Sequence, residues 1–396
     1  MNRNFKQVVG FIITTSIATL STAAVNIGVL QGFTGPIESL TPMMAKSAEL
    51  ALKEASDSGV FLGGEKIKAI RADSTCIDSA AAVTSAERLL DSSNVVAIIG
   101  ASCSGATTAV VNKVLAPKGM VGISSSATSP ALSQVNDKGY FFRTAPSDAS
   151  QGQVLAKIVM NKGIKNIAIT YTNNDYGKGL SESFGNAYKG LGGRIEINAP
   201  HEDDKADYSA EVGALSASGA NSLAVFGYVD KGGRGIVQAS LDSDAFEQFI
   251  FADGMIGESI TNSMGRDLNG TFGTMPGGES EANKKWDIVA ENGGIKLGGP
   301  YLGGSYDAAA IIVLAIQAGN STNRSNIQKN IMNVANAPGT KIFAGELKKG
   351  LNILANGGNI DYVGATDIEF SDIGEVSGTY QEMEVKSSKF ELVKIH

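Results

Sequence analysis

Short runs of apolar residues alternate along most of this chain with longer segments whose apolar residues recur at helical spacing. Such alternation is typical of a parallel sheet with helices on both faces. The rhythm pauses after residues 141–144 and then restarts, so we expect two consecutive α/β sets and hence two lobes. In the first set we predict strands at 25–30, 67–72, 95–99 and 120–123, and helices at 43–55, 79–90 and 104–115. In the second set we predict strands at 167–170, 195–197, 223–226 and 249–251, and helices at 154–160, 179–189, 207–216 and 233–241.

The last part of the chain departs from this rhythm. Three helical segments follow one another at 306–318, 325–336 and 345–354. Two alternating runs, 380–385 and 390–395, are then separated by four polar residues, which predicts a β-hairpin. Helix-rich material after the second α/β set suits a chain that returns to the first lobe.

The first residues have the pattern of an export signal. Arg3 and Lys6 form a basic start, residues 8–20 are mostly apolar, and small residues at 21–24 allow cleavage after Ala23 or Ala24. The alternative is a membrane anchor, but a stretch of roughly 13 residues is too short to span the hydrocarbon core as a helix. We therefore expect a signal peptide over 1–24 and a soluble periplasmic chain, with no cysteine at the cleavage site to carry a lipid.

Charge and histidine content narrow the classes of function. The 396 residues carry a net charge of −7, which argues against a nucleic-acid partner because such partners need a basic face. Only His201 and His396 are present, so a multi-histidine metal site is excluded. Serine–histidine catalysis would depend on His201, which stands in a charged stretch that we interpret as a solvated surface loop. No phosphate-binding loop, dinucleotide fingerprint or nucleophile elbow is found. We therefore expect no enzyme activity, no metal and no cofactor.

The two cysteines suit an exported chain. Cys76 and Cys103 each follow a predicted strand, and neighbouring parallel strands could bring the two ends together. In an oxidising periplasm a bridge closing this loop would contribute roughly 3 kcal/mol to stability. The alternative is two free thiols.

Polar clusters follow several of the predicted strands, at the edge where parallel α/β sheets bind ligands. In the first set, residues 100–105 and 124–130 are rich in serine and threonine. In the second set, residues 175–177, Tyr228 and residues 253–254 offer a carboxylate and aromatic rings. Any single one of these residues is more simply a helix cap or a loop residue. Five clusters at strand ends together favour a binding site, and a zwitterion would match both halves.

Seven short motifs then follow one another along nearly the whole mature length. They are residues 27–36, from Ile27-Gly28 through Gly35-Pro36, Asp73-Ser74-Thr75-Cys76, Gly100-Ala101-Ser102-Cys103-Ser104, Ser126-Ala127-Thr128-Ser129-Pro130, Phe142-Arg143-Thr144, Asp175-Tyr176-Gly177 and Tyr306-Asp307-Ala308. In their order and spacing the chain resembles the Leu/Ile/Val-binding family of periplasmic substrate-binding proteins, which serve ABC importers.

The resemblance implies a fold and a set of partners. It implies a type I periplasmic-binding-protein fold of class α/β, with two doubly wound parallel-sheet lobes joined by three hinge crossovers. Residues 25–144 with 275–364 would form lobe 1, and residues 145–274 with 365–396 would form lobe 2. The protein would be a monomer that closes like a Venus flytrap on an amino acid and presents it to an inner-membrane ABC permease.

The resemblance also implies the site. It pairs Cys76 with Cys103, and it has Ser104, Ser126 and Thr128 hold the α-carboxylate, with Ala127 in the same turn. The carbonyl of Ser126 and the carboxylate of Asp253 would take the α-ammonium, beside Tyr228. Tyr176 and Tyr301 would line the cleft. Charge-assisted hydrogen bonds of this kind are the strong ones.

Three departures from the family bear on specificity. Asp253 stands where the leucine binders carry the longer glutamate, Leu40 stands at an aromatic position, and Ser102 stands at a leucine position. A small or polar amino acid, or an amide, is therefore as open as a branched-chain amino acid. Two other classes also stay open: a sensory module that reports ligand to a receptor, and a secreted hydrolase that uses Ser104 or His201.

Overall fold

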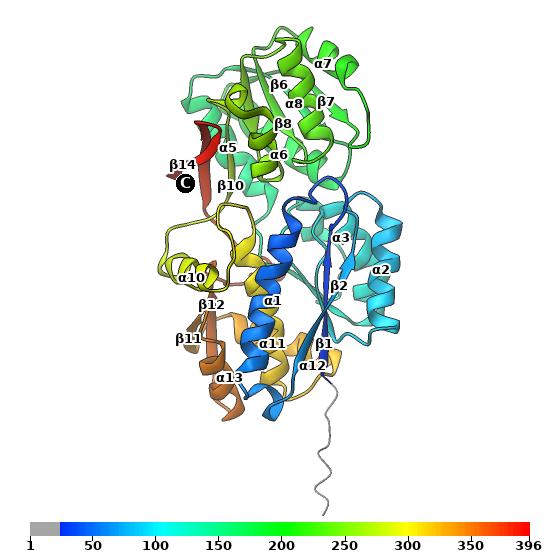
Figure 1. The fold of residues 1–396 in the computed structure, drawn as a ribbon, viewed down its shortest axis with the longest axis vertical. Helices are drawn as coiled ribbons and strands as arrows, with labels where there is room; N and C mark the ends of the chain where they lie inside the picture. Colours follow the sequence, from blue (N-terminus) through cyan, green and yellow to red (C-terminus); the bar gives the residue numbers. More distant parts are fainter. Residues whose placement is uncertain (1–23) are drawn as a thin grey trace, which may run out of the picture.

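The computed structural model describes residues 24–396, which form two α/β bodies stacked along the long axis of the molecule (Figure 1). The predicted export signal at 1–24 lies, but for its last residue, outside the described residues. The first body contains the N-terminal strand, and the second contains the C-terminal hairpin. The expectation of two lobes with parallel sheets is confirmed.

The first body is built on a five-stranded parallel sheet in the order β2-β1-β3-β4-β5. Its strands are β1 Val25–Gln31, β2 Ile67–Asp73, β3 Ala97–Gly100, β4 Val121–Ser124 and β5 Phe141–Arg143. The helices that follow them are α1 Thr41–Asp57, α2 Ser79–Asp91 and α3 Ser104–Val110, which runs through a π-helical turn, Val111–Leu115, into α4 Ala116–Lys118. Short 3-10 turns lie at Phe61–Gly63 and Pro130–Gln134.

The second body is built on a seven-stranded sheet in the order β14-β13-β10-β9-β8-β6-β7. Its strands are β6 Asn166–Thr172, β7 Arg194–His201, β8 Ser222–Phe226, β9 Gln248–Phe251, β10 Phe272–Pro276, β13 Tyr380–Lys386 and β14 Lys389–Ile395. Its helices are α5 Asp148–Asn161, α6 Asp175–Gly190, α7 Ser209–Ser216, α8 Gly232–Asp242 and α9 Glu258–Met264, with 3-10 turns at Asp253–Met255 and Gly265–Leu268. The C-terminal hairpin is confirmed, since β13 pairs antiparallel with both β14 and β10.

The chain returns to the first body after β10. Helices α10 Glu281–Asn292, α11 Leu302–Ala318, α12 Arg324–Ala335 and α13 Leu347–Ala355 follow, with a small parallel sheet of β11 Thr340–Phe343 and β12 Ile360–Gly364. Helix α11 is buried from Leu302 to Gln317 because its sequence is apolar on every face, and it lies beside α1 in Figure 1. Residues 365–376 pack into the same core. The expected lobe boundary at 274/275 falls inside β10.

Close packing between β1 and β3 sets the position of the loop that begins at Gly100. Gly100 has a φ of +127°, and a Cβ atom there would lie 1.9 Å from the carbonyl oxygen of Leu30. Only glycine fits this approach. The loop 100–104 is therefore delivered to the carboxyl edge of the sheet, where the neighbouring strand β4 also ends. Within residues 24–396, no helix has both the length and the apolar character needed to cross a bilayer.

Candidate functional site

The first-body wall of the site consists of two polar turns held against each other. Ser104 begins α3, and its hydroxyl accepts a hydrogen bond from the backbone N–H of Ser129 at 3.1 Å. The Ser126 hydroxyl donates to the carbonyl of Ser102 at 2.9 Å. Two hydrogen bonds thus join the turn after β4 to the turn after β3, and they bring Ser104 and Ser126 to one surface.

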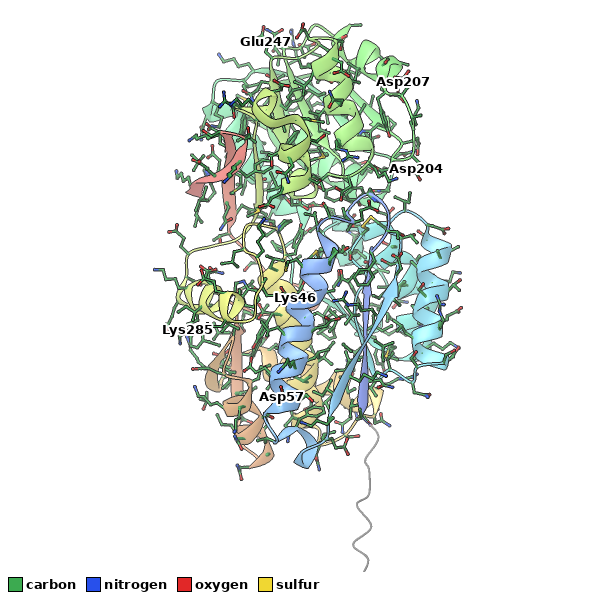
Figure 2. All side chains as sticks on the ribbon, in the orientation of Figure 1. Lys46, Asp57, Asp204, Asp207, Glu247 and Lys285 are labelled. Atoms are coloured by element: carbon green, nitrogen blue, oxygen red, sulfur yellow. A yellow bond between two sulfur atoms is a disulfide. The ribbon has the colours of Figure 1, made fainter. Side chains whose placement is uncertain are left out.

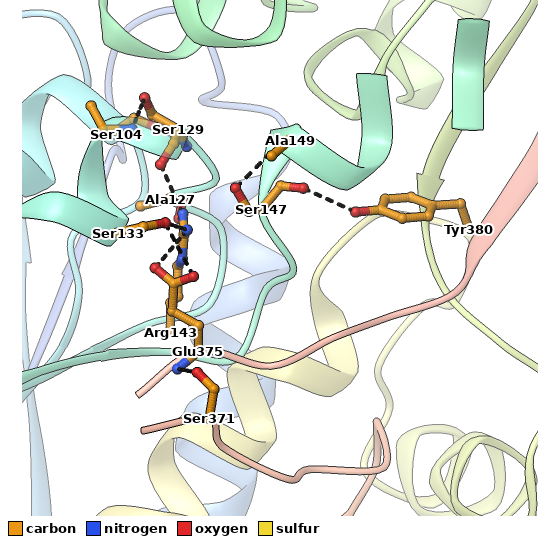
Figure 3. Close-up of polar contacts among 11 residues, drawn as sticks. Ser104, Ala127, Ser129, Ser133, Arg143, Ser147, Ala149, Ser371, Glu375 and Tyr380 are labelled. Atoms are coloured by element: carbon orange, nitrogen blue, oxygen red, sulfur yellow. Dashed lines mark hydrogen bonds and ion pairs between the residues drawn. The ribbon is translucent and has the colours of Figure 1, made fainter. Parts of the chain in front are cut away.

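A buried arginine anchors the second of these turns from behind. Arg143, at the end of β5, is fully buried and donates to the carbonyls of Ala127 (3.1 Å) and Ser129 (2.9 Å), as Figure 3 shows. Its other terminal nitrogen forms an ion pair with Glu375 at 2.7 Å and bonds Ser133. Arg143 therefore fixes the directions of these two carbonyls. The face of the turn that does not bond Arg143 stays free to contact other partners.

The predicted disulfide is present. Cys76 and Cys103 are bonded with their Cα atoms 5.1 Å apart, and Cys103 is the residue before Ser104. The bridge ties the loop after β2 to the start of α3. The alternative of two free thiols is therefore wrong in this structure.

The second-body wall is centred on Asp253, which lies two residues after the end of β9 and is 3% exposed. Tyr176, at the start of α6, has its hydroxyl 3.3 Å from Oδ1 of Asp253, and its ring stacks on Tyr228 with centroids 5.1 Å apart. Tyr301 donates to Oδ2 of Asp253 at 2.6 Å from the start of α11. Because α11 belongs to the first body, this hydrogen bond joins the two bodies across the cleft.

These two walls enclose a cavity of about 30 Å³. Six of the eight predicted ligand residues line it: Ser104, Ser126, Tyr176, Tyr228, Asp253 and Tyr301. The departures Leu40 and Ser102 line it too. Ala127 and Thr128 do not, since both are fully buried behind the surface of the turn. The structure thus brings most of the predicted residues together, while their roles toward a ligand stay predictions.

A second buried carboxyl, for which the sequence pattern gives no signal, lies close to Asp253. Asp148 begins α5 and is fully buried, and within residues 24–396 neither of its carboxyl oxygens has a hydrogen-bond partner. Burial and the nearby Asp253 carboxylate hold the pKa of Asp148 well above its usual range, against the opposing effects of Thr128 and Arg143. Its sequence context, Ser147-Asp148 at a helix start, is that of an ordinary N-terminal turn, so the sequence carries no signal that separates it from a cap.

Burial also raises the pKa of Asp253, but hydrogen bonds from Tyr301, Gln151 and Tyr176 oppose the rise. Donors that point at a carboxylate stabilise its charged form. In the described chain no donor forms a hydrogen bond to the carboxyl oxygens of Asp148. Asp148 therefore keeps a proton more readily than Asp253 does. Of the two, Asp253 is the carboxyl prepared to carry a negative charge in the closed cleft.

The expectation that His201 is a solvated loop residue is wrong. His201 ends β7 and is 1% exposed, and its Nδ1 lies 2.9 Å from the Thr170 hydroxyl. Burial lowers the pKa of His201 to about 4, so the ring is neutral at pH 7. The stretch is charged because its neighbours Asp204 and Asp207 are exposed (Figure 2), while strand alternation turns His201 inward. His201 does not line the cavity that contains Ser104, so the geometry gives the hydrolase hypothesis no support. Over residues 24–396, no group of three or more acidic, histidine or cysteine side chains could hold a metal ion.

Comparison with known proteins agrees with this architecture. Residues 24–347 match the family model described as periplasmic binding protein. An amino acid binding protein of Pseudomonas aeruginosa is 27% identical over 63% of this chain and 66% of its own length. A leucine-specific-binding protein of Salmonella typhimurium is 25% identical over 80% of this chain and 85% of its own.

Solved structures show the same fold. A leucine-binding protein from Thermotoga maritima superposes with a TM-score of 0.77 at 20% identity, covering 94% of this chain and 98% of its own. A branched-chain amino acid transporter substrate-binding protein from Streptococcus pneumoniae, in complex with isoleucine, gives 0.74 at 21% identity, covering 94% and 99%. The family model spans most of the chain, and the two-bodied fold with its disulfide-braced cleft agrees with it. The chain belongs to the periplasmic binding protein family.

Proposed function

We propose that this protein binds a free amino acid between its two bodies. The α-carboxylate would lie against the Ser104 and Ser126 wall, at the start of α3, where the first N–H groups of a helix have no partner within the helix. The α-ammonium would lie against Asp253. The observation that carries the proposal is this buried carboxylate, which faces serine-rich turns of the other body across one small cavity.

The electrostatics of the cavity favour a zwitterion over a plain carboxylic acid. Hydrogen bonds from Tyr301 and Tyr176 stabilise the charged form of Asp253, and a buried charge without a partner is costly. A ligand that carries only a carboxylate would place a second negative charge beside Asp253. An ammonium group instead neutralises Asp253, and charge-assisted hydrogen bonds in a desolvated site are the strong kind. The names of the Pseudomonas and Salmonella relatives agree with an amino acid.

The family suggests where the bound amino acid goes. We infer that the chain is exported, works in the periplasm as a monomer, and presents its closed form to an inner-membrane ABC permease. Related folds have been solved as ABC transporter components, including one from R. palustris in complex with 4-hydroxybenzoate (TM-score 0.75, 17% identity). A sensory role at a receptor is the alternative, and uptake of labelled amino acid lost on deletion of this gene alone would separate the two.

Isothermal calorimetry over the amino acids, with the matching deaminated acids as controls, tests the binding. We expect Asp253→Ala to weaken binding by about 2 kcal/mol or more, roughly thirtyfold, because the ammonium loses its buried partner. Ser104→Ala should weaken the binding free energy by about 1 kcal/mol, since neighbouring donors remain. The exposed Asp267→Ala is the matched control. Unchanged affinity in Asp253→Ala would reject its role, and a wild-type protein that binds no amino acid would reject the function.

A further inference from the structure

Tyr301 lies between two cavities of very different size. The cleft cavity holds about 30 Å³, which is room for about two water molecules. A second cavity of about 360 Å³, here called the hinge cavity, is lined by the three chain passages between the bodies at 144–146, 276–278 and 376–379. Trp286 and Leu297 also line it. Among the residues that the structure describes, Tyr301 is the one that lines both cavities.

The position of the Tyr301 ring is fixed at both ends. Its hydroxyl is bonded to Asp253 at 2.6 Å. Its backbone has a φ of +65°, a left-handed conformation that residues other than glycine seldom adopt. The following helix, α11, is buried along its length, so the backbone cannot shift freely. The ring therefore acts as a fixed partition.

The other walls of the cleft cavity leave a side chain little other space. Ile37, Leu40 and Met44 form an apolar face, beside Cys103 of the disulfide. The stacked rings of Tyr176 and Tyr228 form another face. A ligand whose α-carboxylate lies at Ser104 and whose α-ammonium lies at Asp253 has its side chain in the rest of this cavity, whose remaining walls are the apolar face, the stacked rings and Tyr301.

We propose that Tyr301 limits the size of the ligand, so that the native site takes amino acids with short side chains such as alanine and serine. The hinge cavity is a subsite that longer side chains reach only when the Tyr301 ring is removed. This inference rests on the proposed function and specifies its substrate class. The small volume of the cleft cavity points the same way.

Calorimetry with glycine, alanine, serine, leucine and phenylalanine tests the partition. The wild-type protein should prefer alanine or serine to leucine. Tyr301→Ala should raise the ratio of leucine to alanine affinity at least about tenfold, since hydrophobic side-chain discrimination is of this order per group accommodated. Tyr301→Gly, which suits the left-handed backbone, should do the same and serves if the alanine variant does not fold.

Two control variants separate the ring from other effects. Tyr301→Phe removes the hydrogen bond to Asp253 but keeps the partition, and Leu297→Ala enlarges the hinge cavity without opening it to the cleft. Both should leave the leucine-to-alanine ratio within about threefold of wild type. A ratio unchanged in Tyr301→Ala and Tyr301→Gly, or a wild-type preference for leucine, would overturn the inference while the amino-acid function stands. A wild-type protein that binds none of the five, nor any other amino acid, would overturn both.

Discussion

At the scale of single residues, the main feature of this molecule is a pair of buried carboxyls with unequal surroundings. Asp253 accepts hydrogen bonds from two phenols. Asp148, by contrast, has no partner for its carboxyl oxygens in the part of the chain that is described. Two negative charges close together in one buried site repel each other, so the ionised form of one carboxyl is disfavoured. The proton therefore stays preferentially on Asp148, and the charge that a ligand meets is that of Asp253.

Asp148→Asn should stabilise the protein progressively as pH rises. The folded pKa of Asp148 is well above the ordinary value of 3.8, so above that pH the folded form keeps a proton that the unfolded form has lost. Each pH unit in this window costs the wild type about 1.4 kcal/mol, whereas asparagine does not titrate. Urea unfolding at pH 4.5, 6 and 7.5 measures the difference. A variant advantage that is flat with pH, as in the exposed control Asp267→Asn, would contradict the assignment.

His201 gives the opposite dependence. Its pKa is about 4 when folded, against 6.5 for an ordinary histidine. Between these values the unfolded state binds the extra proton, so the His201 contribution is intact above pH 6.5 and lost as pH falls toward 4. We expect His201→Gln, which can keep a hydrogen bond to Thr170, to lose less stability than wild type over that interval. Parallel thermal melts at pH 4, 5, 6 and 7 check this. Identical pH profiles would mean that the ring is solvated after all.

At the scale of helices and strands, the sequence predicts those elements whose position depends on the local pattern of apolar and polar residues. The strands β1, β3, β4, β6, β8 and β9 are short apolar runs, whereas β2 and β7 alternate apolar with polar residues, and all eight lie where the pattern predicts them. Strand β10 has the sequence Phe-Gly-Thr-Met-Pro, with few apolar residues, and the pattern does not predict it. Its pairing with β13 joins residue 272 to residue 384, and no local pattern shows a partner so distant.

The same limit applies to the site. Ser104, Ser126 and Asp253 could be predicted because each follows a strand of a parallel sheet, where ligands bind. Asp148 could not, because it follows a passage between the bodies and looks like a helix start. The roles of Arg143 and Tyr301 depend on contacts with segments 232 and 48 residues away. The spacing of apolar residues predicts which helix or strand a residue belongs to. Which helices and strands meet is decided by the three chain segments that pass between the two bodies.

The Arg143–Glu375 pair should contribute measurably to the rigidity of the turn at 126–129. The pair joins β5 to the segment before β13, and Arg143 is fully buried. Glu375→Gln leaves the guanidinium without its counter-charge, so we expect a loss of about 2 to 3 kcal/mol in unfolding free energy, which is less than for a fully buried pair because Glu375 is partly exposed. Ser371→Ala is the control, since Ser371 contacts only the backbone of Glu375. Urea denaturation measures both. Equal stability of the two variants would show that the pair is not structural.

At the scale of the whole molecule, the two bodies touch through hydrogen bonds that lie outside the ligand cavity. The carboxylate of Asp230, in the second body, accepts the backbone N–H of Ser39 at 2.8 Å, and its own N–H donates to the carbonyl of Pro36 at 3.0 Å. Thr108 of α3 donates to Asp175 at the start of α6 at 2.9 Å. These bonds exist only when the bodies are close, so they favour closure whatever ligand is bound.

Asp230→Ala should therefore weaken binding of every ligand by the same factor. The apparent affinity scales with the population of the closed form, and the loss of one hydrogen bond to a charged group lowers the ratio of closed to open unliganded protein about tenfold. Ser259→Ala is the matched control, because Ser259 bonds Asp230 within the second body and crosses no gap. Stopped-flow measurements should show faster dissociation, and small-angle scattering a more open unliganded protein. A change in the order of ligand affinities would instead mean that Asp230 acts inside the pocket, since a contact that only favours closure cannot tell one bound amino acid from another.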